Sequence, residues 1–94
     1  MAIGLIAKLK IQPGKNESFE RAFAEIQAEV NQDPGCNFYA CHRTDDPNVY
    51  IVLEQYKDKA ALDAHGQQMK VLGQKLAGLM AGGAEIERYE SIAG

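Results

Sequence analysis

The sequence predicts an α+β domain of the ferredoxin-like type, with the element order βαββαβ and an antiparallel sheet. Three observations predict this fold. Four stretches show the alternation, or the β-branched and aromatic content, that is typical of strands. Two stretches repeat apolar residues at helical spacing. Clusters of Pro, Gly and Asp separate these stretches from one another.

The first strand and the first helix have the clearest patterns. Residues 2–11 alternate, and one face of that strand carries only apolar side chains: Ile3, Leu5, Ala7, Leu9 and Ile11. Residues 15–32 predict an amphipathic helix, whose apolar side carries Phe19, Ala22, Phe23, Ile26 and Val30. Asp33-Pro34-Gly35 ends that helix.

A β-hairpin follows. Residues 36–44 (CNFYACHRT) and 49–56 (VYIVLEQY) predict two strands, and Asp45-Asp46-Pro47-Asn48 predicts the turn between them. Cys36 and Cys41 are five positions apart. In an unbroken strand this odd spacing places them on opposite faces, so we expect two free thiols rather than a disulfide.

The second helical region is expected in two pieces. Asp58 has the character of an N-cap for a short helix, KAALDAH, and we expect the helix to break near Gly66. Helical periodicity resumes over residues 67–81 and ends at Gly82-Gly83. Residues 84–92 (AEIERYESI) predict the last strand.

Length and charge limit the classes of function. A chain of 94 residues predicts one domain over residues 1–94, and a net charge of −3 makes binding to nucleic acid unexpected. No apolar run approaches the roughly 20 residues of a membrane helix, so no membrane partner is expected. The N-terminal MAIGLIAKLK has no basic region before its apolar stretch. Together with the two free thiols, this predicts a cytoplasmic protein.

The predicted fold leaves one face of the sheet without a cover. Both helices of a ferredoxin-like domain lie on the same face, and Ile6 points to the other. An exposed apolar sheet face is typical of an interface. We therefore expect a homodimer that packs sheet against sheet.

The order of several short motifs resembles that of a known family. Asp33-Pro34-Gly35 leads into Tyr39, Glu54-Gln55-Tyr56 ends the third strand, and Ala61-Leu62-Asp63-Ala64-His65 lies on the next helix. This pattern over nearly the whole chain resembles the antibiotic biosynthesis monooxygenase domain, in the manner of the quinol monooxygenases.

The resemblance implies a dimeric α/β barrel. Members of that family include cofactor-independent oxygenases of quinols and anthrone-type polyketides, heme-degrading proteins, and an isomerase of a phosphorylated sugar. The heme-degrading branch is disfavoured here, because the first strand has no Asn and the chain has no Trp. No residue selects the quinol branch over the others.

Three residues are candidates for the site. His65 lies on one helical face with Ala61 and Leu62, where an imidazole can act as a base near neutral pH or simply fill space at a helix end. Glu54 shares a strand face with Tyr50, Val52 and Tyr56. Two roles are open for this carboxylate: a catalytic group, or one partner of a salt bridge. The basic residues that could complete such a salt bridge are Lys8, Lys10, Arg43 and Arg88. Tyr39 is placed to donate a hydrogen bond to a substrate oxygen.

The leading prediction is a monooxygenase of a quinol or hydroxylated aromatic, with His65 as base and Tyr39 and Glu54 as orienting groups. No cofactor or metal is expected, because the chain has no glycine-rich nucleotide loop and no CxxC motif. One alternative is an isomerase of a small enolisable metabolite; if that metabolite is phosphorylated, Lys8 or Lys10 would bind the phosphate. The other is a non-catalytic dimeric binding or stress protein.

Overall fold

The computed structural model describes all residues, 1–94, and has the predicted element order. The strands are β1 (Ile3–Lys10), β2 (Cys36–Arg43), β3 (Val49–Tyr56) and β4 (Glu85–Glu90). The helices are α1 (Asn16–Val30) and α2 (Lys59–Leu72), and a short 3₁₀ helix, η1 (Gly73–Leu76), continues α2. The ferredoxin-like βαββαβ fold predicted from the sequence is thus confirmed.

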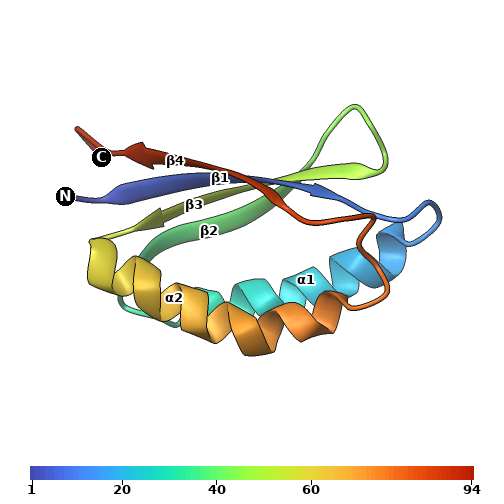
Figure 1. Ribbon diagram of the computed structural model, residues 1–94, viewed down its shortest axis with the longest axis horizontal. Coiled ribbons are helices and arrows are strands. Elements are labelled where there is room, and N and C mark those ends of the chain that lie inside the picture. The colour runs from blue at the N-terminus through green and yellow to red at the C-terminus, as the bar shows by residue number, and fades with distance from the viewer.

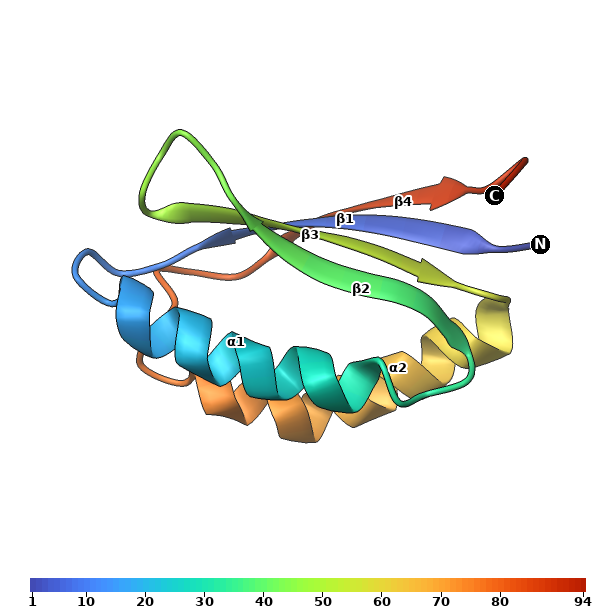
Figure 2. The same ribbon diagram turned by 180° about the vertical axis from the view of Figure 1, so that it is seen from behind.

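The four strands form one antiparallel sheet in the order β2-β3-β1-β4. Both helices lie on the same side of this sheet, and no element covers the other side (Figure 1; Figure 2). β1 and β4 are antiparallel neighbours, so the start of β1 and the end of β4, and with them the two chain termini, lie at the same end of the molecule (Figure 1).

The core lies between the helices and the sheet. The predicted apolar face of β1 is buried throughout, and α1 contributes Phe19, Phe23, Ile26 and Val30 from one side of the helix. Each of these large side chains stabilises the fold by about 1.5–3 kcal/mol through burial alone. These core contacts hold α1 against the sheet, and α2 packs on the same side of the sheet.

The expected break near Gly66 is wrong, because α2 runs without interruption from Lys59 to Leu72. A glycine inside a helix costs only about 1 kcal/mol relative to alanine, which neighbouring packing readily offsets. Here the buried side chains of His65 and Leu72 hold the helix against the sheet on both sides of the glycine. The geometry changes instead at Gly73, where η1 begins, and the helical region ends at Leu76 rather than Ala81.

The expectation for the two cysteines is half right. Both are free thiols, but they lie on the same face of β2. A β-bulge between Cys36 and Phe38 inserts one extra residue, which shifts the alternation of side chains. Cys36 and Cys41 therefore both pack against the core on the helix side of the sheet.

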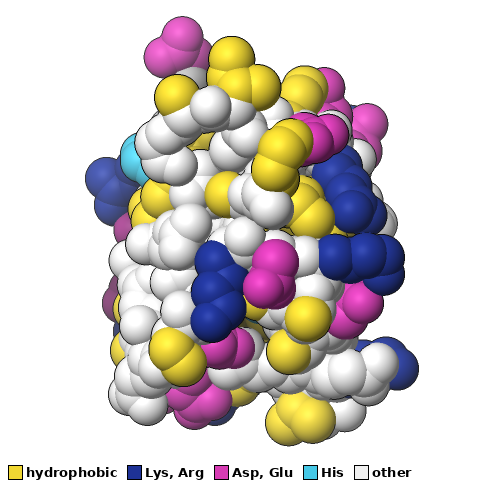
Figure 3. Space-filling model, turned by 90° about the vertical axis from the view of Figure 1, so that its left-hand side faces the viewer, with side chains coloured by type: hydrophobic (Ala, Val, Ile, Leu, Met, Phe, Trp, Pro, Cys, Tyr) yellow, Lys and Arg dark blue, Asp and Glu magenta, His cyan; other side chains and the backbone are white.

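The surface carries charges of both signs. At the end of the molecule that holds both termini, basic, acidic and hydrophobic side chains are interspersed (Figure 3). None of the helices combines the length and the apolar character that a membrane span requires.

Candidate functional site

A cavity of about 330 Å³ lies between α2 and the sheet. Small-molecule sites typically measure about 300–1,000 Å³, so this cavity is at the lower end of that range. Most of its wall is apolar, and the contributions come from all four strands, both helices and the segment after η1: Leu5, Ala7, Leu9, Phe23, Tyr39, Val52, Glu54, Leu62, His65, Gly66, Met69, Leu76, Met80, Ala84 and Ile86. Only Tyr39, Glu54 and His65 bring polar side-chain atoms to this wall.

Three different elements bring these polar residues together. Tyr39 on β2 and Glu54 on β3 are cross-strand partners, so both point to the helix side of the sheet. His65 lies on the buried side of α2, whose start is fixed by the Asp58 side chain accepting a hydrogen bond from the Ala61 N–H at 2.8 Å. The three side chains that the sequence singled out therefore line one cavity.

Glu54 and His65 form a buried pair. His65 Nε2 lies 3.5 Å from Glu54 Oε1, and the two side chains are 9% and 6% exposed. None of the predicted basic partners contacts Glu54. Lys8 and Lys10 are exposed and alternate with the buried residues of β1, so they point away from the cavity, and Arg43 pairs with Glu20 instead.

Tyr56 completes this cluster. Its hydroxyl donates a hydrogen bond to Glu54 Oε1 at 2.7 Å, and its ring centroid lies 4.6 Å from that of His65. The sequence analysis placed Tyr56 on the same strand face as Glu54 but gave it no role at the site. The sequence did contain a sign that Tyr56 lies near Glu54: the two residues are two positions apart on one strand, which puts both side chains on one side of the sheet.

Burial changes the acid–base properties of the pair. It raises the pKa of Glu54 from an ordinary 4.5 to about 7, although the hydrogen bond from Tyr56 acts in the opposite direction. Burial lowers the pKa of His65, and nearby Asp33 partly opposes this change. The two groups together therefore hold a single proton just below neutral pH.

One atom of the pair has no partner within the protein. His65 Nδ1 is buried and makes no hydrogen bond. A buried polar atom without a partner costs about 1–3 kcal/mol, so such atoms are often found where a ligand binds. Burial and the nearby Glu54 also raise the pKa of Tyr39 far above its ordinary range, so its hydroxyl remains a hydrogen-bond donor.

This chain also matches known proteins. Residues 2–71 match the family model described as antibiotic biosynthesis monooxygenase. The chain belongs to the antibiotic biosynthesis monooxygenase family. Its sequence and its fold agree on this assignment, which confirms the resemblance drawn from the motifs around Gly35, Glu54 and His65.

Several solved structures of similar proteins share the fold. A protein from Caulobacter crescentus, with a suggested antibiotic biosynthesis monooxygenase activity, is 36% identical with a TM-score of 0.90, over 98% of this chain and 91% of that one. A Pseudomonas aeruginosa protein is 27% identical, with a TM-score of 0.83 and coverages of 98% and 95%. A conserved protein from Methanosarcina mazei is 26% identical, with a TM-score of 0.87 and coverages of 95% and 91%.

A search of curated proteins gave no match. Membership of the antibiotic biosynthesis monooxygenase family supplies a fold, but it does not by itself supply an activity or a substrate.

The other histidine of the chain and the tyrosine of β4 lie outside the cavity. His42 is exposed and alternates with Cys41 along β2, so it points to the side of the sheet away from the cavity. Tyr89 is half-exposed, and its hydroxyl donates a hydrogen bond to Glu87 at 2.6 Å. No three His, Cys, Asp or Glu side chains come together as a set of metal ligands.

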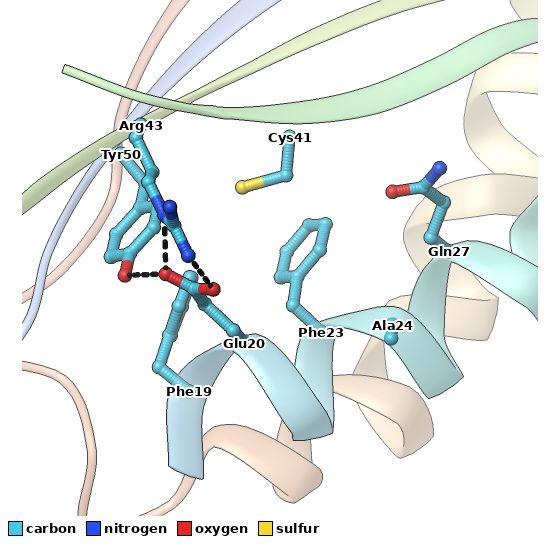
Figure 4. Close-up of a pocket in the computed structure, with 8 residues that line it drawn as sticks. All are labelled: Phe19, Glu20, Phe23, Ala24, Gln27, Cys41, Arg43 and Tyr50. Atoms are coloured by element: carbon cyan, nitrogen blue, oxygen red, sulfur yellow. Dashed lines mark hydrogen bonds and ion pairs between the residues drawn. The ribbon is translucent and has the colours of Figure 1, made fainter. Parts of the chain in front are cut away.

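A second, smaller hollow of about 210 Å³ lies between α1 and β2 (Figure 4). Its two charged groups are paired with each other: Glu20 receives hydrogen bonds from Arg43 at 2.7 and 2.9 Å and a further one from the Tyr50 hydroxyl at 2.6 Å. These donors hold the pKa of Glu20 at about 2. These contacts hold α1 against the sheet. Because the charges are already paired, the hollow offers little to a ligand.

Proposed function

We propose that this protein is a monooxygenase that acts on a quinol or a similar hydroxylated aromatic without a metal or flavin. One observation carries the proposal: an apolar cavity contains a buried Glu54–His65 pair, 3.5 Å apart, that is free to accept a proton above about pH 7. Membership of the family supports the same class of chemistry.

The reaction begins with removal of a proton from the phenolic O–H of the substrate. Above about pH 7, where Glu54 is a carboxylate and His65 is neutral, His65 accepts this proton and Glu54 stabilises the imidazolium that forms. Tyr39 donates a hydrogen bond to a substrate oxygen and orients the ring. The apolar wall excludes water, so the substrate anion is more electron-rich than it would be in solution.

The substrate itself then supplies the electrons. The anion passes one electron to O₂, and the resulting radical pair combines to form a C–O bond and a peroxide anion. This anion takes the proton back from His65 and becomes a hydroperoxide. Loss of water from the hydroperoxide leaves a hydroxylated quinone. One oxygen atom of O₂ enters the product and the other leaves as water. The substrate loses all four electrons, so no external reductant is consumed.

The charge of the cavity favours an uncharged substrate. The cavity wall contains no Lys or Arg, and Lys8 and Lys10 point away from it. A phosphorylated metabolite would leave its charge in an apolar wall without a partner, which is costly. An isomerase of a phosphorylated substrate is therefore the weaker alternative.

We also propose that the protein is a homodimer in the cytoplasm. The uncovered sheet face carries Ile6, Phe38, Leu53 and Tyr89, and we refer to these four residues as the open sheet face. Three of them are between 39% and 50% exposed. A second copy that packs its own open sheet face on this one would bury these side chains. Two free thiols agree with a reducing compartment.

The test of the activity is O₂ uptake with 1,4-naphthohydroquinone, measured above the rate in buffer. Wild-type protein should consume O₂, and His65→Ala should lose at least about 100-fold of that rate, because a positioned base contributes about 10²–10⁴-fold. His42→Ala is the matched control, since the other histidine of the chain is exposed and lies on the opposite side of the sheet. It should keep the wild-type rate.

Two results would contradict the proposal. Uptake by the wild type equal to that of buffer would remove the oxygenase reaction on quinols of this size. Proton exchange into an enolisable substrate without O₂ consumption would instead support the isomerase.

A further inference from the structure

Three exposed residues in its wall indicate where the cavity reaches the surface. Of its lining residues, only Gly66 on α2, Ala84, and Ile86 on β4 are exposed, while the other residues are buried or half-buried. The opening therefore lies between the middle of α2 and the edge strand β4. Two of the three residues around it are among the smallest in proteins.

Neither the backbone conformation nor the packing of the fold requires a glycine at position 66. Gly66 lies in the interior of α2 and does not adopt a positive φ. A Cβ atom at this position would meet no other atom within 4 Å. By contrast, a Cβ at Gly35 would lie 2.7 Å from Ala61 Cβ, so that glycine is required by close packing. Alanine is favoured over glycine in a helix interior, which makes the bare backbone at Gly66 unfavourable for folding alone.

We propose that Gly66 is a specificity-determining residue that keeps the opening wide enough for a ligand with fused aromatic rings. This inference rests on the proposed function, because it assumes that the cavity binds the substrate. A Cβ at position 66 would meet no other atom within 4 Å, and Gly66 lines the cavity, so a longer side chain there has room to extend over the opening. Such a side chain would narrow the passage between α2 and Ala84.

The size and lining of the cavity indicate the kind of ligand. A volume of about 330 Å³ with an almost wholly apolar wall suits a compact, flat ring system with one or two hydroxyl groups. With Gly66 bare, such a ring system can pass edge-on and lie against the backbone of α2. A narrower opening would still admit a single ring.

Gly73 provides a matched control. It lies two turns further along the same helical region, in an ordinary helical conformation, and a Cβ there also meets nothing within 4 Å. It does not line the cavity. Equivalent substitutions at positions 66 and 73 therefore make similar changes to the helix and different changes to the opening.

The experiment measures binding of phenol and 2-naphthol by calorimetry to the full-length protein and to Gly66→Ala, Gly66→Leu and Gly73→Leu. Gly66→Leu should weaken 2-naphthol binding by at least about ten-fold, because overfilled sites lose affinity steeply, while its phenol binding changes by less than about three-fold. Gly73→Leu should leave both affinities within about two-fold of wild type. Gly66→Ala, the milder change, should raise Tm by about 4 °C and weaken 2-naphthol binding by less than Gly66→Leu does.

Three results would overturn the inference: wild-type affinity of Gly66→Leu for 2-naphthol, equal weakening of both ligands, or no binding of either ligand to the wild type. Binding keeps this inference distinct from the oxygenase proposal. A size-dependent effect at position 66 together with no O₂ uptake would retain the role of Gly66 and reject the oxygenase reaction.

Discussion

Glu54 shows how one residue acquires its chemistry from its neighbours. A carboxylate in water has a pKa near 4.5, but Glu54 is only 6% exposed and its nearest polar neighbours are Tyr56 and His65. Desolvation disfavours its charged form, and neither neighbour carries a fixed positive charge. The carboxyl group therefore changes protonation in the range where an enzyme can use it.

The raised pKa of Glu54 predicts a pH-dependent stability. Its pKa is about 7 in the folded protein and 4.5 in an ordinary environment, so the folded state binds the proton more tightly. The resulting stabilisation is full below about pH 4.5 and is lost as the pH rises through about 7. The free energy of unfolding of the wild type should therefore fall by about 2–3 kcal/mol across this range, and that of Glu54→Gln should not.

Urea unfolding at several pH values would measure this difference. Glu29→Gln is the control, because it removes an exposed carboxylate from α1. A wild-type decrease that persists in Glu54→Gln would assign the effect to another group. The lowered pKa of His65 acts in the other direction, with stability lost as the pH falls below about 6.5, so the variants are compared at each pH.

Tyr56 is predicted to act as a positioning residue for Glu54. Tyr56→Phe keeps the ring beside His65 but removes the hydrogen bond to Glu54 Oε1. Since that bond favours the charged carboxylate, its loss should raise the pKa of Glu54 and move the pH profile of kcat/KM upward by about one unit. Tyr56→Phe should also lower the free energy of unfolding by about 1.5 kcal/mol.

Tyr89→Phe is the matched control for this prediction. Tyr89 also donates to a Glu two residues before it, at 2.6 Å, but it does so on an exposed strand. Its substitution should leave the pH profile of kcat/KM unchanged. A loss of stability in Tyr56→Phe without any change in the profile would show that the hydroxyl is only structural.

At the scale of elements, the segment before β2 determines where α2 begins. Gly35 packs against Ala61 in the first turn of α2, and its N–H donates to the Asp33 side chain at 2.8 Å. The Lys57 N–H donates to the Gly35 carbonyl at 3.0 Å, which joins the same segment to the end of β3. His65 lies one turn after Ala61, so these contacts fix its position.

Gly35→Ala should therefore destabilise the protein. The new Cβ would lie 2.7 Å from Ala61 Cβ, so α2 must move, and we expect a loss of about 1–3 kcal/mol. Gly83→Ala is the control, because a Cβ there meets nothing within 4 Å. Thermal unfolding measures both variants, and the double variant Gly35→Ala/Ala61→Gly should recover part of the loss. Equal Tm values for Gly35→Ala and Gly83→Ala would contradict this account of the contact.

The elements also show where sequence patterns reach their limit. Alternation and helical spacing predicted β1, α1, β2 and β3 within a few residues, because each element buries one face. The same reasoning missed the bulge between Cys36 and Phe38 and the continuity of α2 through Gly66. Both depend on packing against other elements, which a local pattern does not contain.

At the scale of the whole molecule, the open sheet face determines the expected assembly. Both helices lie on the other side of the sheet, and β1 and β3 place Ile6 and Leu53 as neighbours at the centre of the uncovered side. Phe38 and Tyr89 are also exposed on that side. An uncovered apolar face of this kind suits the proposed two-fold dimer.

Leu53→Glu should convert the dimer into a monomer. A charge at the centre of the contact would be buried without a partner in the dimer, while it is readily solvated in the monomer. Sedimentation should give about twice the chain mass of 10.3 kDa for the wild type and the single-chain mass for the variant. Val71→Glu is the control, because Val71 is exposed on α2, on the other side of the molecule. A wild-type mass of one chain at micromolar concentration would reject the dimer.

The sequence by itself determined the order of the elements, the buried faces of β1 and α1, and the family, because these follow from local periodicity and short motifs. It also identified Tyr39, Glu54 and His65 as candidates. Only the tertiary structure decided that these three line one cavity, that Tyr56 and not a basic residue contacts Glu54, and that Gly66 lies at the opening. The physical reason is that burial and through-space contact set the pKa of a carboxylate and the shape of a cavity. Those contacts join residues from β2, β3 and α2, which the linear order of the chain does not place side by side.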